Sequence, residues 1–355
     1  MRYFVIEGTP NGEYNATNKA REDVEKILTN NGVKPLYISS INGIEKNKLM
    51  KWKQFFSYRK NTKIWDKDLS SLNKGDIVFI QYPLTNTTSN LETVLEKYKE
   101  KGIIFVAIIH DMDSLRYKPE VQGKFLCKRV NREDKVYLNA MNYIICHNSS
   151  MKNELIKLGN EEDKLIELQL FDYCLDFEPK KFNRTKNDPV IIAGNLSPYK
   201  AKYLASLKDL GVNFNLFGVG YTDEMGGPTI NYKGKFKPDD LLNHLEGGVG
   251  LVWEGETVDT CVGGFGDYLR YNNPHKVSLY LTAGIPVIVW KESALADFIT
   301  KNNLGIAVSN LNEIKDIINN MSDKEYSEIL KNISKISTKT KSGGFLTDAI
   351  NKVKE

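Results

Sequence analysis

The feature that most constrains this chain is a regular alternation of short apolar runs with helical patterns, which is interrupted once and then resumes. Such alternation is typical of parallel sheets covered by helices. Before the interruption it predicts strands near 2–7, 34–38, 76–81, 103–109, 142–146 and 165–169, with helices such as 17–30, 90–101 and 149–158. After it, strands are predicted near 189–193, 212–217, 248–252 and 286–290, with helices near 199–209, 238–245, 274–283 and 311–319.

The interruption lies between Phe171 and Pro189, where two prolines and the charged run from Lys180 to Arg184 break the rhythm. This composition is typical of a linker between domains. A chain of 355 residues also exceeds the size at which one core usually keeps growing. We therefore predict an α/β fold of two doubly wound, Rossmann-like domains facing a cleft: residues 1–172, a linker at 173–188, residues 189–335, and a helical tail at 336–355.

Charge and composition narrow the function classes. The net charge is only +4, from 49 basic and 45 acidic residues, which argues against nucleic-acid binding as the main task. The four cysteines (Cys127, Cys146, Cys174 and Cys261) show no paired metal-ligand spacing and indicate reduced, structural thiols. The first seven residues resemble a β-strand rather than a signal peptide, and no apolar run is long enough to span a bilayer. These observations predict a cytoplasmic enzyme.

The segment from Tyr268 to Trp290 predicts an anion site. Asn273 and Pro274 open a helix, Gly284 ends it, and a buried strand follows. Free N–H groups and the positive end of the dipole gather at the start of this helix, together with four polar side chains: Asn272, Asn273, His275 and Lys276. Lys276 is the candidate for the charged contact with a phosphate, assisted by the N–H groups around Val277 and Ser278; the alternative is an ordinary solvated lysine.

Together with Gly247–Glu254 before it, this segment resembles the bacterial GT-B glycosyltransferases that include β-1,6-galactofuranosyltransferases and the glucosyltransferase 3 enzymes acting on serine-rich adhesins. Further matching pieces, in the family's order, are Phe79–Pro83, Asn86–Thr88, Ile108–Asp111, Ala193–Asn195 and Lys237–Asp240. The resemblance implies a GT-B fold, a UDP-sugar donor, and a last helix that returns to the first domain.

The resemblance also implies donor contacts at the strand ends of the second domain. Gly194 lets the backbone approach a ligand and Asn195 can donate to phosphate or sugar. The adhesin enzymes carry an arginine shortly after this pair, and Lys200 is its nearest replacement here. Phe236 lies where the family frames the uracil. The alternatives are a plain strand-to-helix turn at the first site and a helix start at Pro238 after the second.

An acidic, glycine-rich loop follows the strand near 248–252, and its carboxylates Glu254, Glu256 and Asp259 either bind sugar hydroxyls or are simply solvated. The galactofuranosyltransferase branch carries a very similar loop, which favours galactofuranose or else glucose as the transferred sugar. The spaced glutamate pair of many retaining GT-B enzymes is not evident, which favours inversion. No Asp-x-Asp motif stands out, so we expect no metal or other cofactor.

In the first domain, the resemblance places Gly8 and Thr9 opposite the diphosphate, and Thr17 either lines the same site or caps the next helix. His110 and Asp111 close an apolar strand at its carboxyl end. Transfer with inversion needs a base for the acceptor hydroxyl. Asp111 is the first choice and His110 or Asp113 the reserve; the competing role of Asp111 is to cap the next turn.

The acceptor is expected to be a glycan, a lipid-linked oligosaccharide or a glycoprotein. The basic, aromatic segment 45–60, with Trp52 and Phe56 at helical spacing, either meets an anionic membrane peripherally or packs as a surface helix or a subunit contact, so a homo-oligomer stays open. The leading prediction is thus a glycosyltransferase. The alternative is a non-catalytic GT-B-like subunit that supports a partner transferase.

Overall fold

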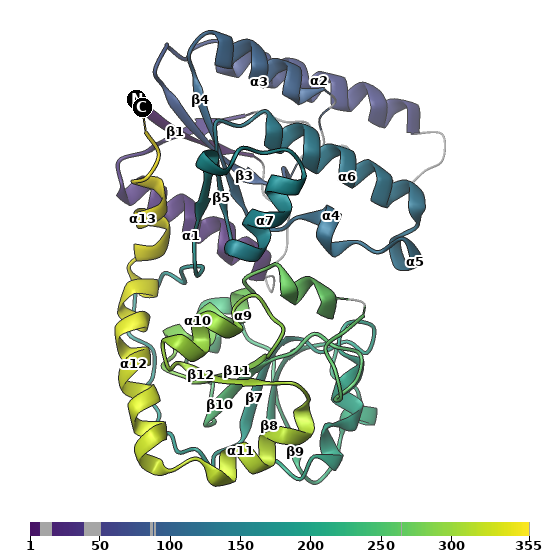
Figure 1. Cartoon of the computed structure of the whole chain (residues 1–355), viewed down its shortest axis with the longest axis vertical. Helices are drawn as coiled ribbons and strands as arrows, with labels where there is room; N and C mark the ends of the chain where they lie inside the picture. The colour runs from purple at the N-terminus through teal and green to yellow at the C-terminus, as the bar shows by residue number, and fades with distance from the viewer. Residues whose placement is uncertain (8–15, 39–50, 86–87, 89, 264, 355) are drawn as a thin grey trace.

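Two six-stranded parallel sheets form the framework of the protein (Figure 1). The computed structural model describes residues 1–7, 16–38, 51–85, 88, 90–263 and 265–354. For residues 16–18 and 51–57 it describes the backbone only. Strand order is β2-β1-β3-β4-β5-β6 in the first sheet and β12-β11-β10-β7-β8-β9 in the second. This confirms the predicted pair of doubly wound α/β domains.

The first domain packs helices on both faces of its sheet. Its strands are β1 (Arg2–Ile6), β2 (Lys34–Tyr37), β3 (Ile77–Tyr82), β4 (Ile104–Ile109), β5 (Tyr143–Cys146) and β6 (Leu165–Glu167). Its helices are α1 (Ala16–Asn30), α2 (Lys51–Leu69), α3 (Leu91–Glu100), α4 (Asp113–Arg116), α5 (Pro119–Gln122), α6 (Lys124–Asn139) and α7 (Ser149–Lys157). One sheet face packs against α1, and the other against α2, α3, α6 and α7.

The second domain repeats this plan. Its strands are β7 (Val190–Asn195), β8 (Phe214–Val219), β9 (Ile230–Gly234), β10 (Val249–Val252), β11 (Val287–Trp290) and β12 (Gly305–Val308). Its helices are α8 (Pro238–Leu241), α9 (His275–Thr282), α10 (Ala296–Lys301) and α11 (Ile314–Asn320), with 3₁₀ segments η3 (Lys202–Asp209), η4 (Asp223–Met225), η5 (Gly266–Arg270) and η6 (Leu311–Glu313). The helix predicted over 199–209 is therefore a 3₁₀ segment, and the one predicted over 238–245 ends at 241.

Two segments join the domains. Between β6 and β7 the chain has no regular strand and no helix, but Phe171, Tyr173 and Cys174 in this stretch are buried. At the end of the chain, α12 (Asp323–Lys341) runs along the second domain and α13 (Gly344–Ile350) packs on α1 of the first (Figure 1). The boundary predicted at residue 335 falls inside the continuous helix α12.

None of the helices in the described part of the chain is both long enough and apolar enough to cross a membrane.

Candidate active site

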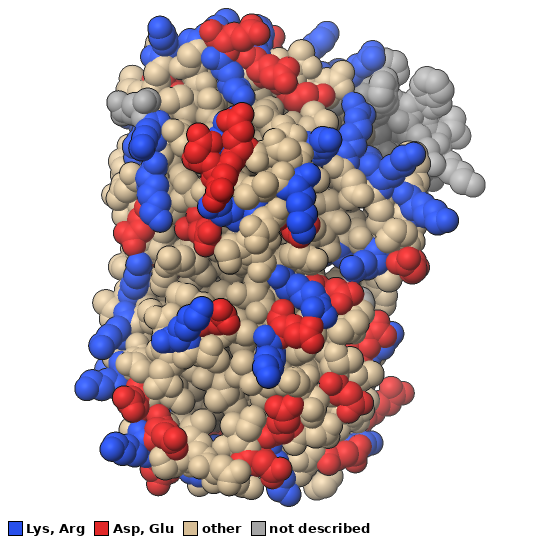
Figure 2. Space-filling model, in the orientation of Figure 1, with Lys and Arg blue, Asp and Glu red and all other residues tan. Residues whose placement is uncertain are grey.

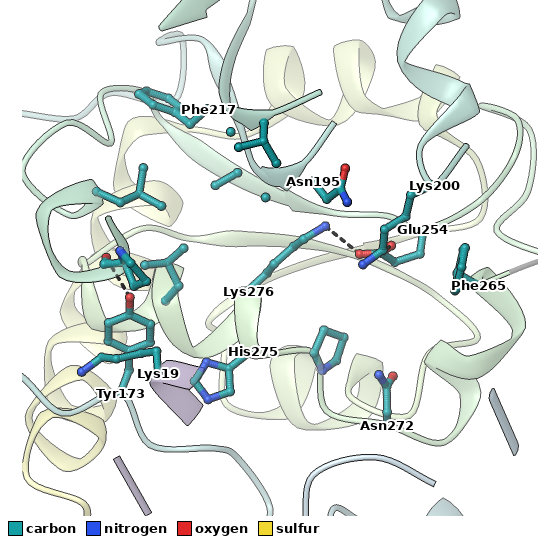
Figure 3. A pocket seen from close by; sticks show the side chains of 18 of the residues that line it. Lys19, Tyr173, Asn195, Lys200, Phe217, Glu254, Phe265, Asn272, His275 and Lys276 are labelled. Atoms are coloured by element: carbon teal, nitrogen blue, oxygen red, sulfur yellow. Dashed lines mark hydrogen bonds and ion pairs between the residues drawn. The ribbon is translucent and has the colours of Figure 1, made fainter. Parts of the chain in front are cut away.

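A pocket of about 600 Å³ lies between the two domains, at the carboxyl ends of the strands of the second sheet. β7 and β10 are neighbours in that sheet although two strands separate them in sequence, so the strand order reverses between them. Ligands of doubly wound sheets bind at such a switch point. Asn195 ends β7 and Glu254 follows β10, and both line the pocket together with residues of the first domain (Figure 3).

Lysine and glutamate side chains form a charge cluster on the floor of the pocket. Lys276, in the first turn of α9, places its Nζ 2.6 Å from Glu254 Oε1, and Lys200 Nζ lies 3.9 Å from Glu254 Oε2. In Figure 3 the Lys276 side chain crosses the pocket toward this carboxylate. Burial raises the pKa of Glu254, but Lys276 and Lys200 outweigh it, so its pKa is lower than usual and the carboxylate is ionised.

The same end of the pocket offers N–H donors. No side chain caps the start of α9, although the Val277 N–H that we expected to bind a ligand donates to Pro274 O within the turn. Asn195 Oδ1 accepts the Ser197 N–H, which leaves the amide NH₂ of Asn195 as its free donor. An anion at this point therefore meets the dipole of α9, two lysines and an amide donor.

Two glycines let β7 and β8 end close to Lys276. Gly194 has φ +134°, and a Cβ there would lie 2.9 Å from Lys276 Cε. Gly218 in the neighbouring strand has φ +145°, and a Cβ there would lie 1.7 Å from the Gly194 carbonyl oxygen. Only glycine fits both the conformation and the spacing.

The opposite wall of the pocket is aromatic. Phe236 lies 3.8 Å, centroid to centroid, from the His244 ring, and Phe217 lies 6.4 Å from Phe236. Phe217, Gly218, Lys235 and Phe236 all line the pocket. A planar base can pack against an apolar wall of this kind, and neighbouring backbone N–H and C=O groups can hydrogen-bond to its edge.

Asp111 enters the pocket from the first domain and is held on several sides. Its Oδ2 lies 3.0 Å from Arg116 Nη1, and Tyr268 from the second domain hydrogen-bonds to its carboxylate. The Tyr268 oxygen also accepts the Met112 N–H at 2.8 Å. Burial raises the pKa of Asp111, although Arg116, Tyr268, Lys200 and Arg21 all favour its charged form. This combination makes the carboxylate more basic than usual, which suits a general base.

His110, the other predicted catalytic residue, does not line the pocket. Its Nε2 is 2.7 Å from Gln81 Oε1, its ring stacks on Phe171, and burial holds its pKa well below the usual value. His110 is therefore a neutral, packed side chain. Asp113, the reserve, starts α4 and also lies outside the pocket lining.

Asn273 and Ser278 were predicted as donor ligands, but their side chains join the domains instead. Asn273 Nδ2 donates to His147 O and Gln169 O, and its backbone N–H donates to His147 Nδ1. The fully buried Ser278 hydroxyl donates to Phe171 O at 2.7 Å. The side-chain atoms of both residues are therefore used where the domains meet, whereas the prediction for Ser278 concerned its backbone N–H.

The other predicted site residues are distributed as follows. Asp111, Gly194, Asn195, Lys200, Phe236, Glu254, Asn272, His275 and Lys276 line the pocket. Glu256 and Asp259 do not, and they contact Lys202 and Asn312. Gly8, Thr9, the Thr17 side chain, residues 45–50 and the side chains of Trp52 and Phe56 lie outside the described part of the structure.

The pocket residues that the sequence analysis did not predict include Phe217, Gly218 and four polar side chains: Lys19, Arg116, Tyr173 and Tyr268. Lys19 Nζ bridges Asp23 and Asp239, and Tyr173 donates to Pro238 O, so both tie the domains together at the edge of the pocket. Arg116 follows Asp111 by five residues, and Asp111 precedes α4, so the pair does not have the i,i+3 or i,i+4 spacing of a helical charge pair that sequence reasoning looks for.

Comparison with known proteins agrees with this geometry. Residues 2–170 match the N-terminal domain, and residues 190–353 the C-terminal domain, of the glucosyltransferase 3-like family. The chain is 33% identical to the β-1,6-galactofuranosyltransferase WbbI of Escherichia coli (strain K12) over 288 residues, which cover 80% of this chain and 81% of that one. It is 26% identical to glucosyltransferase 3 of Streptococcus gordonii over 308 residues, covering 81% and 83%.

Among solved structures, the lipopolysaccharide outer core galactosyltransferase WaaB has the same fold, with a TM-score of 0.60 at 12% identity over 99% of both chains. The two family domains together span nearly all of the chain, in the order and at the boundaries that the two sheets define. The chain belongs to the glucosyltransferase 3-like family of glycosyltransferases.

Proposed function

We propose that this protein transfers a hexosyl group, galactofuranose or glucose, from a UDP-sugar to a hydroxyl of a glycan or glycoconjugate acceptor, with inversion at the anomeric carbon. The observation that carries the proposal is the composition of one pocket. It combines two lysines and a helix start on the second domain with a half-buried carboxylate, Asp111, on the first.

The chemistry of the pocket walls suits one orientation of the UDP-sugar on the second domain. Lys276, Lys200 and the start of α9 bind the diphosphate, and the aromatic wall of Phe217 and Phe236 accommodates the uracil. The sugar then extends toward Glu254, whose oxygens can accept hydrogen bonds from its hydroxyls. A metal is not required in this arrangement, because the cations that neutralise the leaving diphosphate are side chains and the helix dipole.

The chemistry follows from the position of Asp111 across the pocket. Asp111 accepts the proton of the acceptor hydroxyl while that oxygen forms its bond to the anomeric carbon. The bond from this carbon to the diphosphate oxygen breaks, and the electron pair leaves with UDP beside Lys276. A single displacement of this kind inverts the configuration.

The names of the relatives guide the choice of sugar. The more similar relative is a galactofuranosyltransferase, at 33% identity, and the glucosyltransferase 3 of Streptococcus gordonii is at 26%. We therefore place galactofuranose first and glucose second, and a turnover assay with UDP-galactofuranose and UDP-glucose, which measures UDP release, distinguishes them.

Asp111→Asn tests the mechanism. The variant is expected to retain UDP affinity by calorimetry and to lose transfer about 10²–10⁴-fold, the usual contribution of a positioned base. Asp113→Asn, a carboxylate two residues away that does not line the pocket, is the matched control and should stay active. Full activity of Asp111→Asn would remove Asp111 from this role. Failure of the wild type to bind UDP at all would support the alternative, a non-catalytic subunit.

A further inference from the structure

The helices α5 and α6 carry an exposed apolar pair on the first domain. Phe125, at the start of α6, is 86% exposed, the largest value among the large apolar side chains that the structure describes. Val121, four residues earlier in α5, is 51% exposed. Isolated exposed apolar residues are common, but these two are only four residues apart in sequence and lie on helices that pack together.

The exposed face of α6 surrounds Phe125 with basic residues. Cys127, Val130 and Leu138 pack into the domain. Residues three, four and seven positions after Phe125 lie on the same helix face as Phe125, and these are Lys128, Arg129 and Arg132. All three are exposed, as are the flanking Lys124 and Lys135. In the usual amphipathic pattern of a surface helix, the exposed face is polar, so an aromatic ring on this face is unusual.

Two acidic residues that are not buried lie on these helices, Glu120 in α5 and Glu133 in α6, against five exposed basic residues in α6. Asp134 is buried and accepts hydrogen bonds from Tyr82 and the Ser114 N–H, so it faces the core. Glu133 lies 3.6 Å from Arg129 at the edge of the basic face. Figure 2 shows blue side chains gathered along the edge of the first domain where α6 lies in Figure 1.

This surface is continuous with the pocket. Arg116, the last residue of α4, lines the pocket, and Lys118 lies 3.6 Å from Asp267 of the second domain. α5 begins at the next residue, Pro119, and packs on α6. A surface that binds here would therefore lie beside the Asp111 side of the pocket.

We propose that this face of α5 and α6 docks on an anionic phospholipid bilayer. Phe125 and Val121 enter the interface, and the five basic side chains contact lipid headgroups: Lys124, Lys128, Arg129, Arg132 and Lys135. A convex helix with protruding apolar groups fits a planar surface, whereas a soluble anionic ligand of comparable affinity needs a concave site. Docking brings the pocket to the membrane and selects a lipid-linked acceptor. This last step rests on the proposed transferase function.

Co-sedimentation with lipid vesicles tests the proposal. The wild type should bind phosphatidylcholine vesicles containing phosphatidylglycerol, bind pure phosphatidylcholine weakly, and be released by salt. Lys128→Ala, Arg132→Ala and Lys135→Ala combined should reduce partitioning roughly a hundredfold, since each cation near an anionic surface contributes roughly fivefold. Phe125→Ser should reduce it roughly tenfold and remove most of the binding that survives in high salt.

Matched controls come from other exposed positions. Lys331→Ala with Lys335→Ala removes two exposed lysines from α12, and Tyr37→Ser removes an exposed aromatic residue from β2; both should bind like the wild type. UDP affinity, measured on every variant, reports that the fold and the donor site are intact, and keeps this test separate from that of transferase activity. The proposal is overturned if the wild type ignores anionic vesicles at low salt, or if the α6 variants bind as well as the controls.

Discussion

At the scale of single residues, Glu254 competes with any anion for the two lysines of the pocket. Its Oε1 lies 2.6 Å from Lys276 Nζ, and both side chains are largely buried. Lys276→Ala should therefore weaken UDP binding by about 1.5–3 kcal/mol, the range for a hydrogen bond to a charged group. Glu254→Gln should have the opposite effect on UDP, a gain of about 1 kcal/mol, because a like charge near the diphosphate is removed.

Calorimetry with UDP measures both changes. The Glu254→Gln variant should nevertheless transfer sugar more slowly, because an uncharged amide accepts hydrogen bonds from the donor sugar's hydroxyls more weakly than the carboxylate does. Equal UDP affinity of wild type and Lys276→Ala would place the diphosphate elsewhere in the pocket.

A second residue-scale prediction concerns Tyr268, which reaches Asp111 from the other domain. Its hydroxyl favours the ionised carboxylate, so Tyr268→Phe should raise the pKa of Asp111 further. A base must be deprotonated to act, and activity is lost as pH falls through its pKa. The acid limb of kcat/KM should thus move to higher pH, by about one unit for one lost hydrogen bond to a charge. Tyr271→Phe, outside the pocket lining, is the control, and an unmoved acid limb would rule out this coupling.

At the scale of elements, the sequence predicted the interior strands and the ends of α9 well. Pro274 and Gly284 flank a helix that runs from His275 to Thr282, close to the predicted 274–283. The two strands that were not predicted, β9 and β12, are the edges of the second sheet. The sequence of β9, INYKG, is largely polar and lacks the continuous apolar run by which the interior strands were recognised. The sequence of β12, GIAV, is apolar but only partly buried.

The paired ends of β7 and β8 allow a prediction about two glycines. Gly194→Ala introduces a Cβ at positive φ and presses on Lys276, so UDP affinity should fall while the protein still folds, because the contacted atom is the flexible end of a lysine. Gly218→Ala places its Cβ against the backbone of β7, which cannot yield, and should prevent folding of the second domain. Soluble expression, circular dichroism and UDP titration separate the two outcomes; a normal UDP affinity for Gly194→Ala would contradict the proposed contact.

At the scale of the whole molecule, one apolar cluster crosses from the first domain to the second through Phe171 and the C-terminal helices. His147 connects the two domains. Its Nε2 is 3.0 Å from Ile109 O in the first domain, and its Nδ1 accepts the N–H of Asn273 from the second, which requires a neutral ring. Consistent with this, burial lowers its pKa to about 3. These contacts, like those of Tyr268 and Lys19, depend on how the domains meet, which no local pattern in the sequence encodes.

The attachment of α13 to the first domain leads to a prediction about pH. Asp172, which is 5% exposed, accepts the N–H groups of Phe345 and Leu346 at the start of α13, and burial raises its pKa to about 7. Because the pKa of Asp172 in the folded protein is higher than its usual value of 3.8, the folded protein binds this proton more tightly than the unfolded chain does. The stabilisation is complete below about pH 4 and is lost as pH rises toward 7.

Asp172→Asn removes this titration. Between pH 5 and 7 the free energy of unfolding of the variant, relative to the wild type, should rise by roughly 2 kcal/mol, since each unit of pH contributes about 1.4 kcal/mol while only the folded state holds the proton. Urea unfolding at pH 5, 6, 7 and 8 measures this slope, which is independent of any constant cost of fitting asparagine at the helix start. Asp348→Asn, an exposed carboxylate of the same helix, should leave the slope unchanged. Parallel curves for Asp172→Asn and wild type would mean that Asp172 is already ionised at pH 5, and that α13 is held by its apolar contacts alone.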